Sequence, residues 1–253
     1  MKVTFLGTGT SQGVPVIGCE CAVCRSMDYR DKRLRTSIHV ATETASVVID
    51  SGPDFRQQML REGIPKLDAV VITHSHKDHI AGLDDVRAYN FRQNMVMPIY
   101  GTKAVLDRLL VEFDYAFEDT KYPGIPKLDL REIEDTPFSL GGLRFIPLPV
   151  WHHKMPVMGF RVGDFAYITD ANRLPEPTWP KLAGVKVLVL NALQREKHIS
   201  HFNLEEALAT ALKIGATQTY FTHISHKLGF HKAVDKELPA SVALAYDGLS
   251  VTL

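Results

Sequence analysis

Four metal-binding side chains follow a short apolar run in the first third of the chain. The run, Asp68–Thr73, is rich in β-branched residues and predicts a short buried strand. The side chains that come next, within six residues, are those of His74, His76, Asp78 and His79. Neutral imidazoles and carboxylates are good ligands for divalent zinc, manganese or iron. Because such clusters are rare by chance, the stretch predicts a metal site rather than a solvated polar loop.

The spacing within this stretch favours more than one ion. His74 and His76 are two residues apart, so their side chains point to the same side of an extended segment. Asp78 and His79 stand at the turn into a predicted helix, where they are better placed for a second, adjacent metal. Asp50, after another predicted strand, could also be a ligand. We interpret it as a turn residue or as an acceptor that fixes the ligand loop.

Further candidate ligands stand at the ends of other predicted strands. They are His152, Asp170 and His223. Strand ends collect along one rim of a sheet, where sites are commonly built. Seven donors are too many for one tetrahedral ion and suit two ions that share a carboxylate, the role we assign to Asp170. A plain turn aspartate is the alternative interpretation of that residue.

The other histidines carry less weight. His153 is the weaker candidate beside His152, because only one of two neighbours can point to a given side of an extended chain. Three more are interpreted as ordinary histidines: His39, His198 and His231. His201 stands just ahead of a predicted helix that starts near Asn203, so its residue type alone indicates a helix-entry position.

All three cysteines of the chain lie within six residues, at Cys19, Cys21 and Cys24. An odd number so tightly clustered cannot form a disulfide framework without a leftover thiol, and in a reducing compartment such clusters more often bind metal. The spacing Cys-x-Cys-x-x-Cys lets three thiolates converge on one tetrahedral ion, which then needs a fourth ligand from elsewhere. Three reduced thiols without an ion are the alternative.

The composition is that of a globular protein. The chain has 253 residues, 45% hydrophobic and 23% charged, with a formal net charge of zero. The neutral balance argues against a large nucleic-acid footprint, although it leaves room for a local basic patch. No apolar run approaches the roughly 20 residues that span a bilayer, and the N-terminus shows no signal-peptide pattern. We therefore expect a cytoplasmic protein with no membrane partner.

The predicted elements favour one α/β domain over residues 1–253, with helices outside the sheets. Residues 112–136 are interpreted as a loop over the site or at a subunit contact, which leaves a homodimer open. Predicted strands cover residues 2–7, 37–41, 45–49, 68–73, 98–100, 138–149, 158–162, 165–169, 185–190 and 217–222, and a terminal hairpin covers 243–246 and 249–253. Predicted helices cover residues 55–63, 80–91, 103–111 and 204–214.

Two N-terminal features could serve an anionic substrate. The glycine-rich loop Gly7–Pro15 follows a strand and could present backbone N–H groups to a phosphate, or it is a tight turn in which glycine permits positive φ. A basic cluster comes after it, and one or two of its side chains could neutralise an anion although most are expected to be solvated. Its members are Arg30, Lys32, Arg33 and Arg35.

The histidine motif carries a family resemblance. The run from His74 to His79, with the three later ligands, resembles the metallo-β-lactamase superfamily and its His-x-His-x-Asp-His signature. The likeness extends from Val3-Thr-Phe-Leu-Gly-Thr-Gly to Thr222-His223-Ile-Ser-His226. It implies a hydrolase with a dinuclear metal site, and the signature is poor at naming a substrate.

A narrower resemblance comes from the cysteine region and His226. Together they look like the PhnP-type phosphodiesterases of bacterial phosphonate breakdown, which open a cyclic phosphate on ribose and have an α/β fold, an αββα four-layer sandwich. The resemblance implies a structural zinc held by the three cysteines and His226. It also places His201 at the family's proton donor to the leaving oxygen. The stretch 151–160 is a little longer than the family's and lies beside the substrate.

The resemblance implies a mechanism with two catalytic metal ions, zinc or manganese. We expect His74, His76 and His152 to hold one ion. Asp78, His79 and His223 are expected to hold the other, with Asp170 between the two. A hydroxide that bridges the ions would attack a small phosphodiester, either a cyclic phosphate or a nucleotide-like diester. Asp78, Asp170 and His201 are thus the expected catalytic residues.

Three alternatives stay open. Transfer-RNA 3′-end nucleases share the glycine loop and the histidine motif. They also need a basic, protruding arm that grasps RNA, and this neutral chain shows no obvious insertion that would form one. Lactamase or lactonase activity gains no support from the cysteines. A non-catalytic metal-binding protein is disfavoured, because such a protein would usually have lost a ligand. The residues that contact substrate, among Arg30, Arg33, Arg35 and Lys227, are left undecided.

Overall fold

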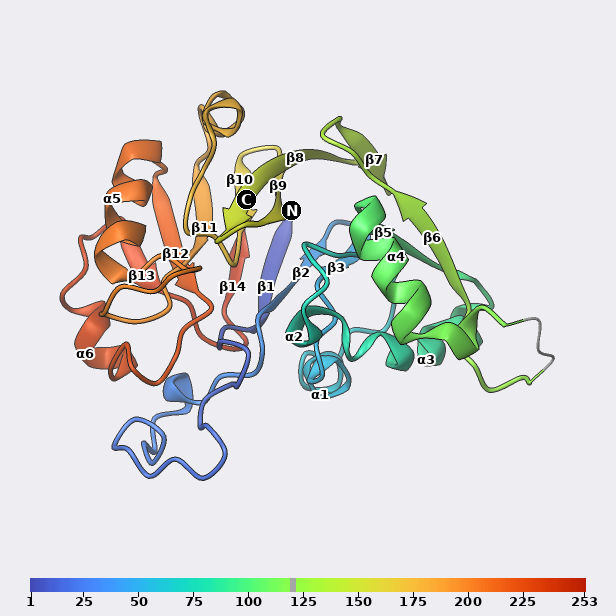
Figure 1. Ribbon diagram of the computed structural model, residues 1–253, viewed down its shortest axis with the longest axis horizontal. Coiled ribbons are helices and arrows are strands. Elements are labelled where there is room, and N and C mark those ends of the chain that lie inside the picture. Colours follow the sequence, from blue (N-terminus) through green and yellow to red (C-terminus); the bar gives the residue numbers. More distant parts are fainter. Residues whose placement is uncertain (119–121) are drawn as a thin grey trace.

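Two sheets of seven strands each pack against one another in the computed structural model, which describes residues 1–118 and 122–253. Helices cover the outer face of each sheet, α1–α4 on one side and α5 and α6 on the other (Figure 1). The architecture is therefore a four-layer αββα sandwich, as predicted.

The first sheet has the strand order β14-β1-β2-β3-β4-β5-β6. Its first half is antiparallel and includes the β2–β3 hairpin, whereas β3 to β6 run parallel. The strands are β1 (Lys2–Gly7), β2 (Ser37–Ala41), β3 (Ser46–Ile49), β4 (Ala69–Val71), β5 (Met97–Gly101), β6 (Leu128–Glu132) and β14 (Ser250–Thr252).

The second sheet has the strand order β13-β12-β11-β10-β9-β8-β7. It too changes from antiparallel pairing, in β7 to β10, to parallel pairing, in β10 to β13. The strands are β7 (Phe138–Leu140), β8 (Leu143–His152), β9 (Met155–Val162), β10 (Phe165–Ile168), β11 (Val187–Asn191), β12 (Gln218–Thr222) and β13 (Val242–Leu244).

The helices follow local sequence signals. In α5, the side chain of Asn203 accepts from the Glu206 amide and Glu206 reaches back to the Asn203 amide, a capping box that fixes the start. The helices are α1 (Phe55–Arg61), α2 (Lys77–Ile80), α3 (Arg87–Gln93), α4 (Lys103–Glu112), α5 (Leu204–Ile214) and α6 (His231–Asp235). The 3₁₀ turns are η1 (Tyr29–Asp31), η2 (Leu83–Val86), η3 (Asp114–Ala116), η4 (Glu176–Thr178) and η5 (Pro180–Leu182).

The main core lies between the sheets. Alternate residues of β1, such as Val3 and Phe5, meet Phe160 and Tyr167 of the second sheet there, and all four are fully buried. Separate apolar clusters lie under α1, α3 and α4 and under α5 and α6. Because each sheet is covered on both faces, the loops at the strand ends are held on a rigid base.

Three predicted elements differ from the structure. The helix expected at 80–91 is broken after Ile80, because the Gly82 amide donates to the carbonyl of Ser51 instead of continuing the helix. The segment 112–136, expected to be a loop, contains the edge strand β6, and its residues 119–121 lie outside the described part. The expected terminal hairpin does not form, because β13 pairs with β12 while β14 pairs with β1 in the other sheet.

None of the helices in the described residues has the length and apolar character needed to cross a membrane.

Candidate metal centre

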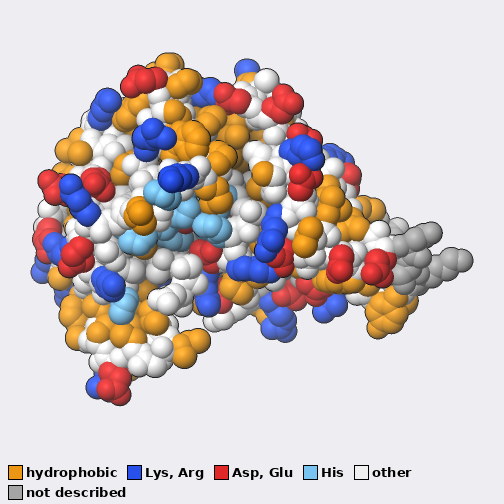
Figure 2. All heavy atoms as spheres, in the orientation of Figure 1, with side chains coloured by type: hydrophobic (Ala, Val, Ile, Leu, Met, Phe, Trp, Pro, Cys, Tyr) orange, Lys and Arg blue, Asp and Glu red, His pale blue; other side chains and the backbone are white. Residues whose placement is uncertain are grey.

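The candidate ligands meet at one rim of the sandwich. His74, His152, Asp170 and His223 all stand at or just beyond the ends of strands, three of them in the second sheet. A space-filling view shows histidine side chains gathered in a hollow of the surface (Figure 2). The expectation that separate strands deliver their ligands to one place is therefore met by the geometry.

One group of ligand atoms surrounds the Asp170 carboxylate. The Oδ2 atom of Asp170 lies 3.3 Å from Nε2 of His79 and 3.2 Å from Nδ1 of His223. Asp78 joins the group, with its Oδ2 atom 3.2 Å from the same His79 nitrogen. All four residues offer a ligand atom within 4.8 Å of one another, a separation that one divalent ion can bridge.

The remaining candidate histidines form a second cluster of rings. The ring of His76 is 4.7 Å from that of His74 and 5.1 Å from that of His152, measured between centroids. His152 and Asp170 also form a compact group with His201, again with ligand atoms within 4.8 Å. Asp170 thus belongs to both groups, which is the position expected of a shared carboxylate.

Hydrogen bonds orient the rings so that Nε2 is free for an ion. The Nδ1 atom of His79 lies 2.7 Å from the Asp50 carboxylate, and that of His152 lies 2.9 Å from the carbonyl of Ser200. The hydroxyl oxygen of Thr73 lies 3.0 Å from Nδ1 of His74. The Nε2 atoms of His74 and His79 are buried and have no hydrogen-bond partner, a costly arrangement unless a cation binds there.

The charges of the site also fit divalent cations. The carboxylates of Asp50, Asp78 and Asp170 are buried, and within residues 1–118 and 122–253 no lysine or arginine pairs with them. Burial lowers the pKa of His74 well below its usual value, so its ring is neutral and able to donate a lone pair. Burial opposes protonation of His79 too, but the carboxylates around it raise its pKa well above the usual value. Bound divalent cations would neutralise the negative charge of these carboxylates.

Three residues of the site have left-handed backbone conformations. The φ angles are +68° at Asp50, +54° at Asp170 and +55° at His223. Such angles are uncommon outside glycine and persist only where the surroundings enforce them. Strain of this kind is concentrated here at strand ends that turn ligands inward, which supports a functional role for these positions.

The three cysteines form a separate cluster with His226. The Sγ atoms of Cys19, Cys21 and Cys24 lie 3.3, 3.2 and 3.5 Å from Nδ1 of His226. In a tetrahedral zinc site, with bonds of about 2.3 Å to sulfur and 2.0–2.1 Å to nitrogen, the two ligand atoms stand about 3.5 Å apart. A hydrogen bond from the Cys24 amide lowers the pKa of Cys21 to about 6, which favours its thiolate. The donors fit a structural zinc.

Several contacts of the site have no signal in the sequence. Thr36 places its hydroxyl 3.2 Å from Nδ1 of His223, and Asn172 bonds to backbone groups on two other loops. His198, expected to be ordinary, has its ring 5.1 Å from that of His201. His39 and His231 do bind ordinary partners, Ser46 and Arg33.

The N-terminal basic residues do not form a free phosphate site. Arg33 is buried and donates to Thr8, to the Ala245 carbonyl and to His231. Arg30 pairs with Asp28, and Arg35 pairs with Asp54. These guanidinium groups are therefore occupied by the fold.

The glycine-rich loop is a turn, the second of the two interpretations offered for it. The amides of Gly9, Thr10 and Gly13 donate to the carbonyls of Leu34, Ile224 and Thr10, which leaves none of these three for a phosphate. Gly13 has a φ of +67°, a conformation that glycine adopts without strain.

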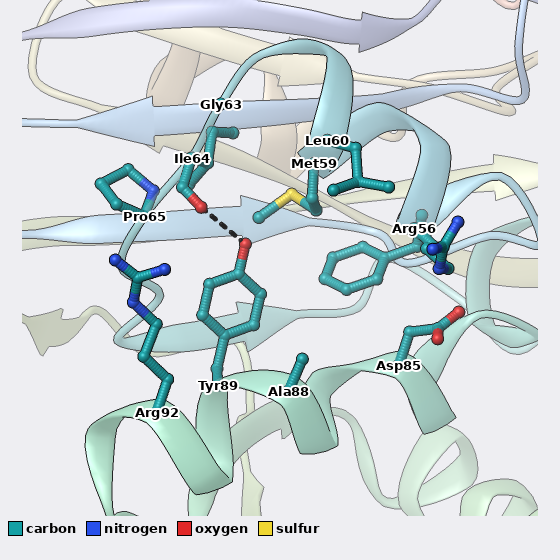
Figure 3. Close-up of a pocket in the computed structure, with 11 residues that line it drawn as sticks. Arg56, Met59, Leu60, Gly63, Ile64, Pro65, Asp85, Ala88, Tyr89 and Arg92 are labelled. Atoms are coloured by element: carbon teal, nitrogen blue, oxygen red, sulfur yellow. Dashed lines mark hydrogen bonds between the residues drawn. The ribbon is translucent and has the colours of Figure 1, made fainter.

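A pocket of about 450 Å³ lies between α1 and α3 (Figure 3). Its lining is mainly apolar, with Arg92 at one end and Arg56 and Asp85 at the other. The hydroxyl of Tyr89 donates to the carbonyl of Ile64 at 2.9 Å along one wall. None of the candidate ligands lines this pocket, so we assign the chemistry to the histidine cluster.

The match to known proteins agrees with this geometry. A family model described as a β-lactamase superfamily domain matches residues 45–224. The chain belongs to the metallo-β-lactamase superfamily. The matched range includes the candidate ligands from His74 to His223.

One solved relative supports the narrower resemblance. A new diphosphatase from the PhnP family is 42% identical, with a TM-score of 0.93, and the alignment covers 99% of this chain and 96% of that one. The predicted likeness to this branch of the superfamily is therefore confirmed.

Curated relatives carry other names. An octanoyltransferase of Porphyromonas gingivalis is 38% identical over 256 residues, which is all of this chain and 52% of that protein. The chain thus spans about half the length of this relative. A ribonuclease Z of Mycobacterium marinum is 27% identical, with 70% of this chain and 75% of that protein covered.

Proposed function

We propose that this protein is a metal-dependent phosphohydrolase that cleaves a small phosphodiester or a nucleotide-like diphosphate. The observation that carries the proposal is the position of Asp170, which lies in one compact group with Asp78, His79 and His223 and in another with His152 and His201. The similarity to a diphosphatase of the PhnP family supports the choice of phosphate chemistry.

The residues divide into two groups in this proposal. His74, His76 and His152 would hold one ion, and Asp78, His79 and His223 would hold the other. Two divalent ions bound there would supply a nucleophilic water at neutral pH and neutralise charge on the phosphoryl oxygens. Asp50, Thr73 and the Ser200 carbonyl fix the tautomers of the rings that they contact, so each ring presents Nε2 to its ion.

His201 is proposed to hydrogen-bond to the leaving oxygen. Its ring is 4.5 Å from that of His152 and 4.9 Å from that of His223, which places it beside both ligand groups. Burial lowers the pKa of His201 to about 3. An anionic substrate beside the ring would favour its protonated form, so the donor role depends on the bound phosphate.

The proposal predicts a pattern of hydrolysis. Purified, metal-analysed protein is assayed against cyclic phosphodiesters, linear phosphodiesters and nucleoside diphosphate derivatives, with and without a chelator. We expect turnover of at least one phosphate class, loss with the chelator and recovery with Zn²⁺ or Mn²⁺. Full metal loading without turnover of any of these substrates would refute the proposal.

A second candidate is cleavage of transfer-RNA precursors, which the similarity to a ribonuclease Z favours. A labelled precursor in the same assay distinguishes the two activities, because the small-substrate proposal predicts no cleavage at the 3′ end. We propose no acyl transfer, since the octanoyltransferase name describes a protein about twice as long as the matched segment.

A further inference from the structure

Asn172 joins three loops around the metal ligand His152. Its side-chain oxygen accepts from the His153 amide at 3.0 Å, and its side-chain nitrogen donates to the carbonyl of Ile199 at 2.9 Å. Its own amide donates to the carbonyl of Trp151 at 2.9 Å. The β8–β9 turn, the segment 171–173 and the loop 194–201 are thus tied together at the edge of the site, and we call them the Asn172 rim.

The third of these loops reaches the site itself. Its last residue, His201, packs its ring 4.5 Å from that of His152, and the carbonyl of Ser200 accepts from the same His152 ring. The ring of His198 lies a further 5.1 Å from that of His201. The rim therefore borders the reacting centre rather than a remote surface.

The Asn172 rim is positively charged. Lys154, Arg173 and Lys197 are exposed, one on each loop, and none of them forms an ion pair in the described residues. The guanidinium of Arg173 lies over the ring of Trp151, 5.1 Å from its centroid, which fixes its direction. Glu196 is the single acidic residue of the three loops, in a chain whose formal net charge is zero.

Exposed cations without an ion-pair partner at the edge of a phosphate site can neutralise an anionic substrate. The arginines near the N-terminus already contact carboxylates or carbonyls, so they are not available for this role. We propose that the Asn172 rim is an anion subsite that binds the non-reacting phosphate of a diphosphate substrate while the other phosphate lies at the metal ligands. The inference rests on the proposed function, and it narrows the substrate class from single phosphodiesters to compounds with two adjacent phosphates.

The test compares two charge-matched triple variants. The rim variant carries Lys154→Ala, Arg173→Ala and Lys197→Ala. The control variant carries Lys66→Ala, Arg144→Ala and Lys186→Ala, which remove the same charge near the starts of β4, β8 and β11, at the strand ends opposite the site. The substrates are ADP-ribose, which has two phosphates, and bis(p-nitrophenyl) phosphate, which has one. Melting temperature and metal content are measured on both variants.

We expect the rim variant to raise KM for ADP-ribose by about tenfold or more with kcat unchanged, because the lost contacts are made equally in the ground and transition states. The KM of the rim variant for bis(p-nitrophenyl) phosphate should change less than about twofold. The kcat and KM of the control variant should also change less than about twofold. Equal effects on the two substrates, or an equal effect of the control variant, would overturn the subsite.

A binding measurement separates this inference from the proposed function. Calorimetric titration of ADP into the metal-loaded proteins should show an affinity for the rim variant that is lower by about tenfold, even if neither substrate is turned over. If the wild type turns over neither substrate yet shows this difference, the subsite stands and the proposed function fails. Equal ADP affinity of the wild type and the rim variant would overturn the subsite alone.

Discussion

At the scale of single residues, the site depends on groups that hold the ligands as much as on the ligands. Asp50 is the example with the clearest geometry, since its carboxylate lies 2.7 Å from His79 Nδ1 and also accepts from the Thr73 amide and hydroxyl. This bond keeps the proton on Nδ1 and leaves Nε2 for the ion. The sequence placed Asp50 beside the ligand loop, but it could not show which ring it holds.

Replacing Asp50 by asparagine should weaken metal binding with little change of fold. Asparagine tolerates the left-handed backbone at this position, but it would present an N–H to the Nδ1–H of His79 and favour the wrong tautomer. We expect a loss of about 10–100-fold in metal affinity, measured by competition with a chromogenic chelator. Asp164→Asn, on the remote β9–β10 turn, is the control, and equal affinities of the two variants would contradict the role of Asp50.

His201→Ala should reveal whether this ring acts on the leaving group. If it donates a hydrogen bond to the leaving oxygen, turnover of alkyl phosphodiesters should fall by about 10²–10⁴-fold, while nitrophenyl esters, whose leaving groups need no proton, should fall far less. The comparison of kcat values for the two ester types is the readout. An equal loss of kcat on alkyl and nitrophenyl esters would contradict the proton-donor role of His201.

At the scale of elements, two loops approach so closely that only glycine fits between them. A Cβ atom on Gly82 would lie 2.0 Å from the Gly52 carbonyl oxygen, and one on Gly52 would lie 2.0 Å from the Asp78 carbonyl oxygen. This contact presses the loop that carries Asp50 against the turn that carries Asp78 and His79. It also explains why the helix expected at 80–91 breaks, a tertiary effect that hydrophobic periodicity does not encode.

Gly82→Ala should therefore disturb both stability and the metal site. We expect a loss of about 1–3 kcal/mol in the free energy of unfolding, since the clash is with backbone, and a reduced metal content. Gly163→Ala is the control for the clash, because nothing lies within 4 Å of the added Cβ. Its φ of +58° strains alanine, whereas Gly82 has a φ of −94°, so the control carries backbone strain without the steric contact. Denaturant unfolding and metal analysis give the comparison. A Gly82 variant with the metal content of the control would contradict this packing role.

At the scale of the whole molecule, the sequence predicted the layers better than the connections. Short apolar strands such as Phe165–Ile168 and the capped helix at Asn203 carry local signals, and these elements were predicted within a few residues. The crossing between β13 and β14 was missed, because it depends on distant hydrogen bonds. In the turn between these two strands, Asp247 accepts from the hydroxyl of Thr8 and the amide of Leu34. These bonds hold the turn against the N-terminal segment, so β14 can pair with β1.

The same division holds for the site. The predicted ligands are brought together, because histidine and aspartate at strand ends are a pattern that a linear sequence displays. Thr36 and Asn172 were missed, since a single threonine or asparagine in a loop carries no such pattern and acquires its role only through contacts across the fold. The sequence thus points to the metal chemistry, whereas the rim that would select a substrate becomes visible only in three dimensions.

The number and position of the bound ions test the central claim most directly. Anomalous diffraction data collected on both sides of the zinc absorption edge, from crystals of zinc-loaded protein, would locate each ion. We predict two peaks about 3.5–4 Å apart on either side of the Asp170 carboxylate, and a third among the cysteines and His226. A single peak or none in the histidine cluster, with the cysteine peak present, would contradict a two-metal hydrolase.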